Sequence, residues 1–273
     1  MDLGKKQVLT VVKIVDFGVY LGSEKEKVLL PKKQVPSGIE LGDPIEVFLY
    51  KDSSDRLIAT THEPKLTLGQ IAVLDVLQVG KFGAFLDWGL EKDLFLPFKE
   101  QTVKVKPGDE CLVALYIDKS ERLCATMKVY DYLQKNSDYQ RDDRVEGRIY
   151  ESSDNFGLFV AVDDKYSALI PKREAPYGLH VGDKVHARVT EVKPDGKLTL
   201  SVREKAFIQM NKDAEVVLKR IQENGGSLAL NDKSDAEVIK AELGLSKNAF
   251  KRAVGHLYKA RKIEILEDGL KLK

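Results

Sequence analysis

The sequence is poor in the residues that build covalent cross-links and metal sites. Only two of its 273 residues are cysteines, Cys111 and Cys124, and both stand in strand-like runs. We expect buried free thiols there, not a disulfide or a metal pair, and such thiols are typical of a reducing cytosol. The four histidines are scattered over three blocks of the chain, and no two are spaced i, i+4. A zinc site therefore lacks ligands, and no cofactor is expected.

Several other features are missing from the chain. It contains no run of some 18 apolar residues, so we expect no membrane-spanning helix and no membrane partner. The N-terminal MDLGKKQVLTVV does not resemble a secretory signal. There is no glycine-rich phosphate loop and no Gly-x-Ser-x-Gly elbow, and the paired aspartates fall in predicted turns. We therefore expect a cytoplasmic protein that is not an enzyme.

What the chain does contain is one motif written three times. Phe17-Gly18-Val19-Tyr20, Phe82-Gly83-Ala84-Phe85 and Phe156-Gly157-Leu158-Phe159 all read aromatic-Gly-x-aromatic. A Leu-Pro or Ile-Pro pair begins 13, 14 and 14 residues after the first aromatic, and a Gly-Asp pair begins 11 residues after each proline. Landmarks held in register over three blocks indicate a tandem repeat of small domains.

Each block predicts five short strands separated by turn signals. In the third block they are expected at 145–151, 157–162, 168–171, 184–193 and 197–202. Five strands in about 60 residues fit the partly open barrel of the OB fold. We place the repeats at 1–68, 69–130 and 144–203, with a polar segment at 131–143 as a hinge or short helical linker. The link between the first two repeats is brief, so these two should pack together.

The spacing of the two aromatics leaves two interpretations open. Residues i and i+3 of a regular strand point to opposite faces. A glycine after the first aromatic permits a bulge, and a one-residue bulge would bring both rings to one face. The rings either belong to the core or form an exposed platform for unpaired bases. Recurrence in three blocks favours the platform.

These motifs resemble the S1-type RNA-binding domain, and the third block (VEGRIYESSDNFGLFV through GKLTLSVREK) resembles it most fully. Where many S1 domains place an RNA-contacting histidine after the third strand, this chain has proline in all three blocks. The resemblance implies that the rings stack on bases and that nearby basic residues meet phosphate. The implied RNA-binding residues of the repeats are Phe17, Tyr20, Arg56, Phe82, Phe85, Arg122, Arg148, Phe156, Phe159, Lys172, Arg173 and Lys197.

The last 70 residues, 204–273, change to helical periodicity. A first helix is expected to stop at Asn224-Gly225-Gly226, and a capping box at Ser234-x-x-Glu237 predicts the start of a second. Ser246 can cap a third helix, with Phe250, Val254, Leu257 and Tyr258 along one face. A hairpin follows at 263–272. Three helices and a hairpin predict an α/β winged helix.

The third helix of this unit carries the basic residues Lys247, Lys251, Arg252 and Lys259. Third helices of this kind often enter a nucleic-acid groove, but they also dock on proteins. Contact with nucleic acid, contact with protein and a solvated basic face all remain open. Net charge runs from 0 in residues 1–68 and −3 in 69–143 to +1 in 144–203 and +3 in 204–273. We therefore expect nucleic-acid affinity to depend on the C-terminal half.

Three S1-like repeats followed by a winged helix resemble the conserved virulence factor B family of bacterial RNA-binding regulators. Membership implies a mainly β multidomain protein that binds single-stranded RNA and regulates gene expression after transcription. Two other functions stay open, an adaptor that docks on the ribosome or the transcription machinery and a DNA-binding transcription factor. The sequence does not address oligomeric state.

Overall fold

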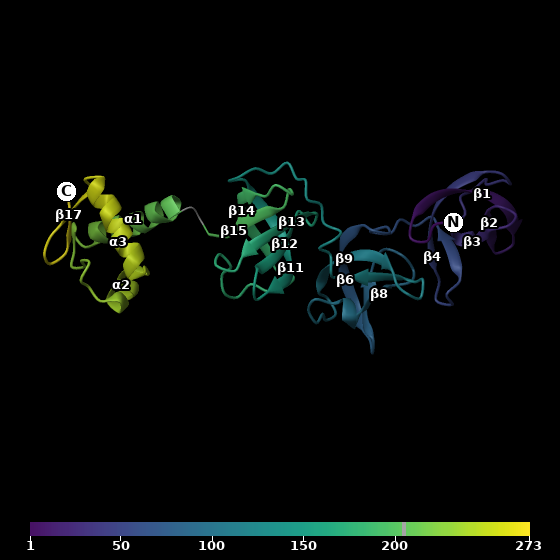
Figure 1. The fold of residues 1–273 in the computed structure, drawn as a ribbon, viewed down its shortest axis with the longest axis horizontal. Coiled ribbons are helices and arrows are strands. Elements are labelled where there is room, and N and C mark those ends of the chain that lie inside the picture. Colours follow the sequence, from purple (N-terminus) through teal and green to yellow (C-terminus); the bar gives the residue numbers. More distant parts are fainter. Residues whose placement is uncertain (204–205) are drawn as a thin grey trace. The chain divides into compact units, whose positions relative to one another are not determined.

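The computed structural model describes residues 1–203 and 206–273 of the chain (Figure 1). These divide into two compact units, Met1–Val202 and Arg203–Lys273. The first unit is built from strands, with two single turns of 3-10 helix at Lys32–Gln34 and Phe98–Glu100. The second combines helices with a small sheet.

Each of the three blocks in the first unit contributes five strands. The first block holds β1 (Lys6–Val15), β2 (Gly18–Gly22), β3 (Lys27–Pro31), β4 (Pro44–Lys51) and β5 (Leu57–Thr60). The second holds β6 (Ile71–Val79), β7 (Gly83–Asp87), β8 (Leu94–Pro97), β9 (Glu110–Ile117) and β10 (Leu123–Thr126). The third holds β11 (Arg144–Ser153), β12 (Gly157–Val162), β13 (Tyr166–Pro171), β14 (Lys184–Val192) and β15 (Leu198–Ser201).

The strands pair as the OB fold requires, which confirms the predicted fold class. The first and third blocks are closed barrels with the orders β1-β2-β3-β5-β4 and β11-β12-β13-β15-β14. A short parallel pairing closes each one, Leu29 with Ile58 and Ala168 with Leu198. The middle block has the equivalent order β10-β9-β6-β7-β8, although within residues 69–130 no strand ladder joins β8 to β10.

The glycine of each aromatic motif lies where two backbones approach too closely for a side chain. Gly157 pairs with Pro171 across β12 and β13, and a Cβ at this glycine would collide with the carbonyl oxygen of Ile170. Its φ of +119° is also one that L side chains rarely adopt. Equivalent collisions occur between Gly18 and Leu30 and between Gly83 and Leu96. The motif glycine and the Leu/Ile-Pro pair are therefore two sides of one contact.

The Gly-Asp pairs tie the last hairpin of each barrel to its first strand. Gly182 donates its N–H to the carbonyl of Ile149 at 2.8 Å, and Ile149 donates to the carbonyl of Asp183 at 2.9 Å. The Asp183 carboxylate also accepts the N–H of His180 at 2.8 Å. The same bonds recur at Gly42-Asp43 and Gly108-Asp109. The Gly-Asp pair therefore has a structural role, because its polar groups form hydrogen bonds within the barrel.

The first two barrels share a hydrophobic core, which confirms that they pack together. Phe48 and Tyr50 of β4 pack edge-on against Trp88 of the second barrel, with ring centroids 5.8 and 6.3 Å apart. Leu66, from the short connection, is 2% exposed in the same cluster. Burying a side chain of this size stabilises a structure by roughly 1.5–3 kcal/mol.

A small buried cluster joins the second and third barrels, so the prediction of a hinge or helical linker at 131–143 is wrong. Leu133 and the preceding Val129 are buried against Leu112 of β9 and Tyr150 of β11. The segment adopts turns, without a helix in residues 131–143. Its polar composition misled the prediction, because the few apolar side chains of the segment, with Leu133 the most buried, pack against the barrels.

A buried arginine makes a further link between these two barrels. Arg148 of β11 is 5% exposed, and its guanidinium meets Asp164 in its own barrel and Glu110 of β9, each at 3.2 Å. The prediction that Arg148 contacts RNA phosphate is therefore wrong. Its charge is already paired with two carboxylates, and removing one partner from a buried pair is costly.

The second unit is a winged helix. Its elements are α1 (Ala206–Glu223), β16 (Ser227–Leu228), α2 (Ala236–Leu243), α3 (Lys247–Lys259), β17 (Ile263–Ile265) and β18 (Leu270–Leu272). The sheet order is β16-β18-β17. Residues from all three helices form its core with Leu228, Ile263 and Leu270. The predicted helix stop holds, since Gly226 donates to the Ile221 carbonyl at 2.8 Å.

Two details of this unit differ from the sequence prediction. The cap of α2 is Asp235, whose carboxylate accepts the Glu237 N–H at 2.8 Å, while Ser234 accepts the N–H of Asn231 in the preceding turn. The N-cap is therefore Asp235, one residue later than the Ser234 of the predicted capping box. Tyr258 is 56% exposed and does not join the buried face of α3.

Both cysteines are free and buried, as expected. Burial raises the pKa of each thiol, Cys111 and Cys124, to about 11. No helix in the described part of the chain is long and apolar enough to cross a membrane.

The motif glycine generates a stability prediction. Gly157→Ala should destabilise the first unit by roughly 3 kcal/mol, because it adds a backbone collision to an unfavourable φ. Gly178→Ala is the matched control, since Gly178 has φ +88° but nothing within 4 Å of a Cβ. It should cost only about 1 kcal/mol. Urea denaturation measures both, and equal losses would contradict the collision.

Candidate nucleic-acid interface

The two rings of the third motif lie together at the surface. Phe156 precedes β12 and is 62% exposed, whereas Phe159 within β12 is half-buried. Their centroids are 6.4 Å apart with the planes inclined by 61°. The two rings are therefore neighbours with an exposed face, as the platform interpretation expects.

The bulge that accompanies this arrangement is on the neighbouring strand, not at the motif glycine. The pairing of β12 with β13 runs without a break from Gly157 to Val162. The register shift lies in β11, between Ile149 and Glu151. Phe156 reaches its partner because it stands in the turn before the strand, where strand alternation does not apply.

The bulged residue of β11 supports the platform from below. Tyr150 is 2% exposed, and its ring centroid lies 6.2 Å from that of Phe159. Desolvation by burial raises the pKa of this tyrosine, so the ring stays neutral. The other two barrels have Val12 and Leu77 at the shifted position, so the third barrel alone has an aromatic support here.

A third exposed ring, which the sequence did not suggest, extends the pair. Tyr130 comes from the segment between the second and third barrels, is 37% exposed, and stands edge-on to Phe159 at 6.1 Å. Phe156, Phe159 and Tyr130 thus form a continuous set of rings, here called the aromatic row. No motif could have indicated Tyr130, because it follows the last strand of the second block and meets Phe159 only in the folded chain.

Lys197 lies at the Tyr130 end of the aromatic row. Its Nζ is 5.4 Å from the centroid of the Tyr130 ring and 2.9 Å from the carboxylate of Asp195. The pKa of Lys197 is raised above its usual range, first by its hydrogen bond with Tyr130 and then by Asp195. The amine is therefore protonated throughout the physiological range and can meet a phosphate beside the rings.

The other basic residues predicted for the third barrel are at its surface. Lys172 is exposed and donates its Nζ to the carbonyl of Asp154 at 2.7 Å, next to the turn that holds Phe156. Arg173 is exposed beside it. Pro171, in place of the family's histidine, is the strand partner of the motif glycine. Lys172, like Lys197, thus already has a polar partner, and a phosphate would have to share or replace that partner.

The first barrel carries the same pair of rings. Phe17 is 59% exposed and stands edge-on to Tyr20 at 6.4 Å, with Lys27 Nζ 5.4 Å from the Tyr20 centroid. Arg56 is highly exposed and forms an ion pair with Asp52 of its own turn at 2.7 Å. The arrangement resembles that of the third barrel.

The second barrel arranges its rings differently. Phe82 is 71% exposed, but Phe85 packs against Phe95 of β8 at 5.3 Å. Arg122 forms an ion pair with Asp55, which belongs to the first barrel. Of the RNA-binding residues predicted in this barrel, Phe82 is exposed, Phe85 packs within the barrel and Arg122 contacts the first barrel.

In the winged helix, α3 separates an apolar face from a basic one. Phe250, Ala253, Val254 and Leu257 are buried. The predicted basic residues divide into Lys251, Arg252 and Lys259, which are exposed, and Lys247, which is half-buried. Three of the four cations are therefore presented to solvent. Within residues 1–203 and 206–273, no group of three His, Cys, Asp or Glu side chains could hold a metal ion.

Comparison with family models assigns all four domains. The S1 domain model matches residues 3–62 and 68–128, and the S1 RNA binding domain model matches 138–203. A CvfB-like winged helix domain matches 215–272. The repeats recognised from the aromatic motifs are thus S1 domains, which indicates nucleic-acid binding.

Relatives match over most of the chain. An uncharacterized protein YitL of Bacillus subtilis is 29% identical over 96% of this chain and 91% of its own length. Conserved virulence factor B of Staphylococcus aureus is also 29% identical, over 83% of this chain and 78% of its own. A crystal structure of a multidomain protein with nucleic acid binding domains from Streptococcus pneumoniae is 26% identical with a TM-score of 0.53, covering 99% of this chain and 98% of that one.

The domain order seen in the fold, the models matched in that order and the relatives similar over nearly the whole length agree with one another. The chain belongs to the bacterial conserved virulence factor B family, in which S1 domains precede a CvfB-like winged helix.

Proposed function

We propose that the protein is a non-catalytic regulator that binds single-stranded RNA, mainly on the third S1 barrel, and acts after transcription. The observation that supports this most directly is the aromatic row of Phe156, Phe159 and Tyr130 beside the protonated Lys197. Rings of this kind stack on bases, and a cation at the end of the row attracts the backbone.

The geometry favours an unpaired strand over a duplex. A base can lie on a ring only when its own face is free, so the strand must be single or splayed. Each stacked base typically contributes about 1–3 kcal/mol. The groups gathered at the row are rings and one protonated amine, which stack and attract charge, and this supports binding without catalysis.

The regulatory part of the proposal comes from the relatives. The Staphylococcus aureus relatives are named conserved virulence factor B, and the influence on virulence that we propose for this chain is regulation of transcripts. Binding of transcripts by S1 barrels is a physical means of exerting such an influence. The cytoplasmic location and the contact of α3 with nucleic acid stay predictions.

The double variant Phe156→Ala, Phe159→Ala should weaken binding of a short mixed-sequence RNA by roughly 10- to 100-fold, because two stacking surfaces are lost. Fluorescence polarisation at fixed salt measures this. Tyr177→Ala, which removes a fully exposed ring of the same barrel outside the row, should leave affinity unchanged. Circular dichroism checks folding, and a collapse of the double variant would instead assign the two rings to the core.

Tyr130 provides an independent test of the row. Tyr130→Phe should retain RNA affinity, since the ring remains, whereas Tyr130→Ala should lose about fivefold or more. Lys197→Ala should reduce the slope of log K against log salt by about 0.7, the value for one lost phosphate contact on a single strand. A loss of affinity in Tyr130→Phe equal to that in Tyr130→Ala would contradict stacking at this position.

A further inference from the structure

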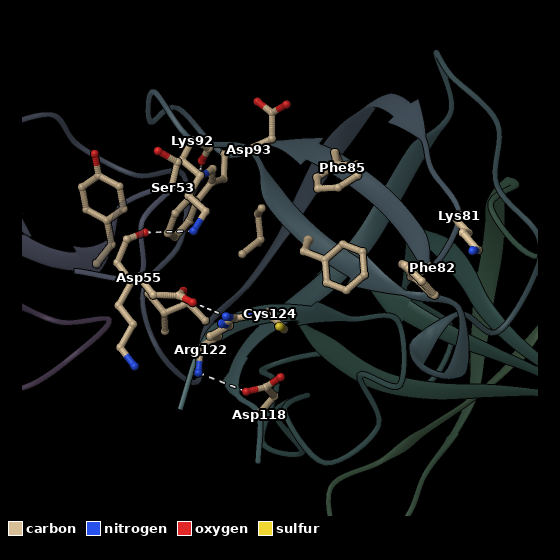
Figure 2. A pocket seen from close by; sticks show the side chains of 16 residues that line it. Ser53, Asp55, Lys81, Phe82, Phe85, Lys92, Asp93, Asp118, Arg122 and Cys124 are labelled. Atoms are coloured by element: carbon tan, nitrogen blue, oxygen red, sulfur yellow. Dashed lines mark hydrogen bonds and ion pairs between the residues drawn. The ribbon is translucent and has the colours of Figure 1, made fainter. Parts of the chain in front are cut away.

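A pocket of about 380 Å³ lies where the first and second barrels meet (Figure 2). Phe82 and Phe85 of the second barrel lie on one side of it, and Ser53 and Asp55 of the first barrel lie on the other. Arg122 stands between the two sides. The volume is at the lower end of the range for small-molecule sites, roughly 300–1,000 Å³, with room for about one nucleoside.

The two sides of this pocket are held in place by the contact between the barrels. The Phe48 and Tyr50 rings pack on Trp88, which also lines the pocket. Lys92 of the second barrel donates its Nζ to the carbonyls of Lys51 at 3.2 Å and Asp52 at 2.8 Å. The turn that carries Ser53 and Asp55 is therefore fixed opposite the aromatic side, and the pocket is preformed.

The charge at this pocket differs from that at the aromatic row. Arg122 occupies the position equivalent to Lys197, ahead of the last strand. Lys197 is paired with Asp195 of its own turn, whereas the guanidinium of Arg122 is paired with Asp55 of the other barrel. A phosphate would have to displace that carboxylate. Phe82, in contrast, has a ring that is 71% exposed at the pocket. Lys81 Nζ stands 5.4 Å from the centroid of this ring, so a base stacked on Phe82 would lie beside a cation that also lines the pocket.

We infer that this pocket is a second RNA site, which holds one base of the bound strand against Phe82 while Asp55 competes with the backbone phosphate for Arg122. The inference rests on the proposed function, since the ligand is the same single strand. The pocket and the aromatic row differ in how many bases each one binds. The aromatic row accepts several bases side by side, and the pocket accepts one base between two barrels.

The first test removes the ring that would hold the base. Phe82→Ala in the full chain should weaken RNA binding by about five- to twentyfold in fluorescence polarisation, and its high exposure makes loss of folding unexpected. Phe98→Ala is the matched control, because Phe98 is also exposed in the second barrel, at 48%, but does not line the pocket. Equal affinities of Phe82→Ala and Phe98→Ala would overturn the inference.

The second test removes the competing carboxylate. Asp55→Asn should strengthen RNA binding two- to tenfold and make the salt dependence steeper by about 0.7 in the slope, because Arg122 then gains a phosphate partner. Glu24→Gln makes the same change of charge on another exposed turn of the first barrel, outside the pocket. A slope in Asp55→Asn no steeper than in Glu24→Gln would overturn the role of this ion pair.

A direct readout is available because Trp88 is the chain's single tryptophan. Its fluorescence should change when a short RNA binds, also in the Phe156→Ala, Phe159→Ala background, and should not change in Phe82→Ala. If the full chain binds RNA in fluorescence polarisation while the fluorescence of Trp88 does not change, the inference about the pocket is wrong and the proposed function stands. If no single-stranded RNA binds, both the inference and the proposed function are wrong.

A titration with free nucleotides tests whether the pocket binds a base within an RNA strand or a base in a free nucleotide. AMP and UMP, added alone, should change Trp88 fluorescence only at concentrations far above those of the oligomer, since a lone nucleotide lacks the contacts of the row. A response to AMP or UMP with none to RNA would overturn the inference, because the pocket would then belong to a free nucleotide.

Discussion

The surface that each S1 barrel offers depends on one close approach of two backbones, between the motif glycine and the carbonyl before the strand-ending proline. At Gly157 the carbonyl of Ile170 occupies the space of a Cβ, so the turn can carry Phe156 to the same region as Phe159. Any side chain at the glycine would push the two strands apart and separate the rings. The proline that replaces the family's histidine is part of this contact, since it faces the glycine across the ladder.

The sequence predicted those parts of the molecule that are determined locally and repeated. Recurring landmarks gave the five strands of each block, the predicted OB topology and the winged helix, because each depends on turn residues and hydrophobic periodicity nearby. The errors arose where distant segments meet. Arg148 appeared free in the sequence, but Glu110, 38 residues away, lies beside it in the fold. Tyr130 looked like the end of the second repeat and Leu133 like part of a polar linker, although both make contacts with the third barrel.

The three barrels share a fold but differ in how they present it. The third has an aromatic row supported by Tyr150 and accompanied by Lys197. The second has its arginine occupied by a carboxylate from the first, and its rings border a pocket. Net charge per segment pointed towards the C-terminal half, but it could not reveal that Arg122 of the second barrel is paired with a carboxylate of the first. The three repeats thus differ in the contacts that each barrel makes with its neighbours as well as in their own residues.

The packing of Leu133 between the second and third barrels, and of Trp88 between the first and second, affects how the molecule folds. Counted by repeats, residues 1–202 are three domains, yet by contact they form one compact unit. The first and third barrels have cores of their own, but further buried clusters join each barrel to the next, so none is expected to unfold while the others stay intact. The first unit should therefore melt as a single cooperative block, and its stability belongs to the set of barrels and not to each one.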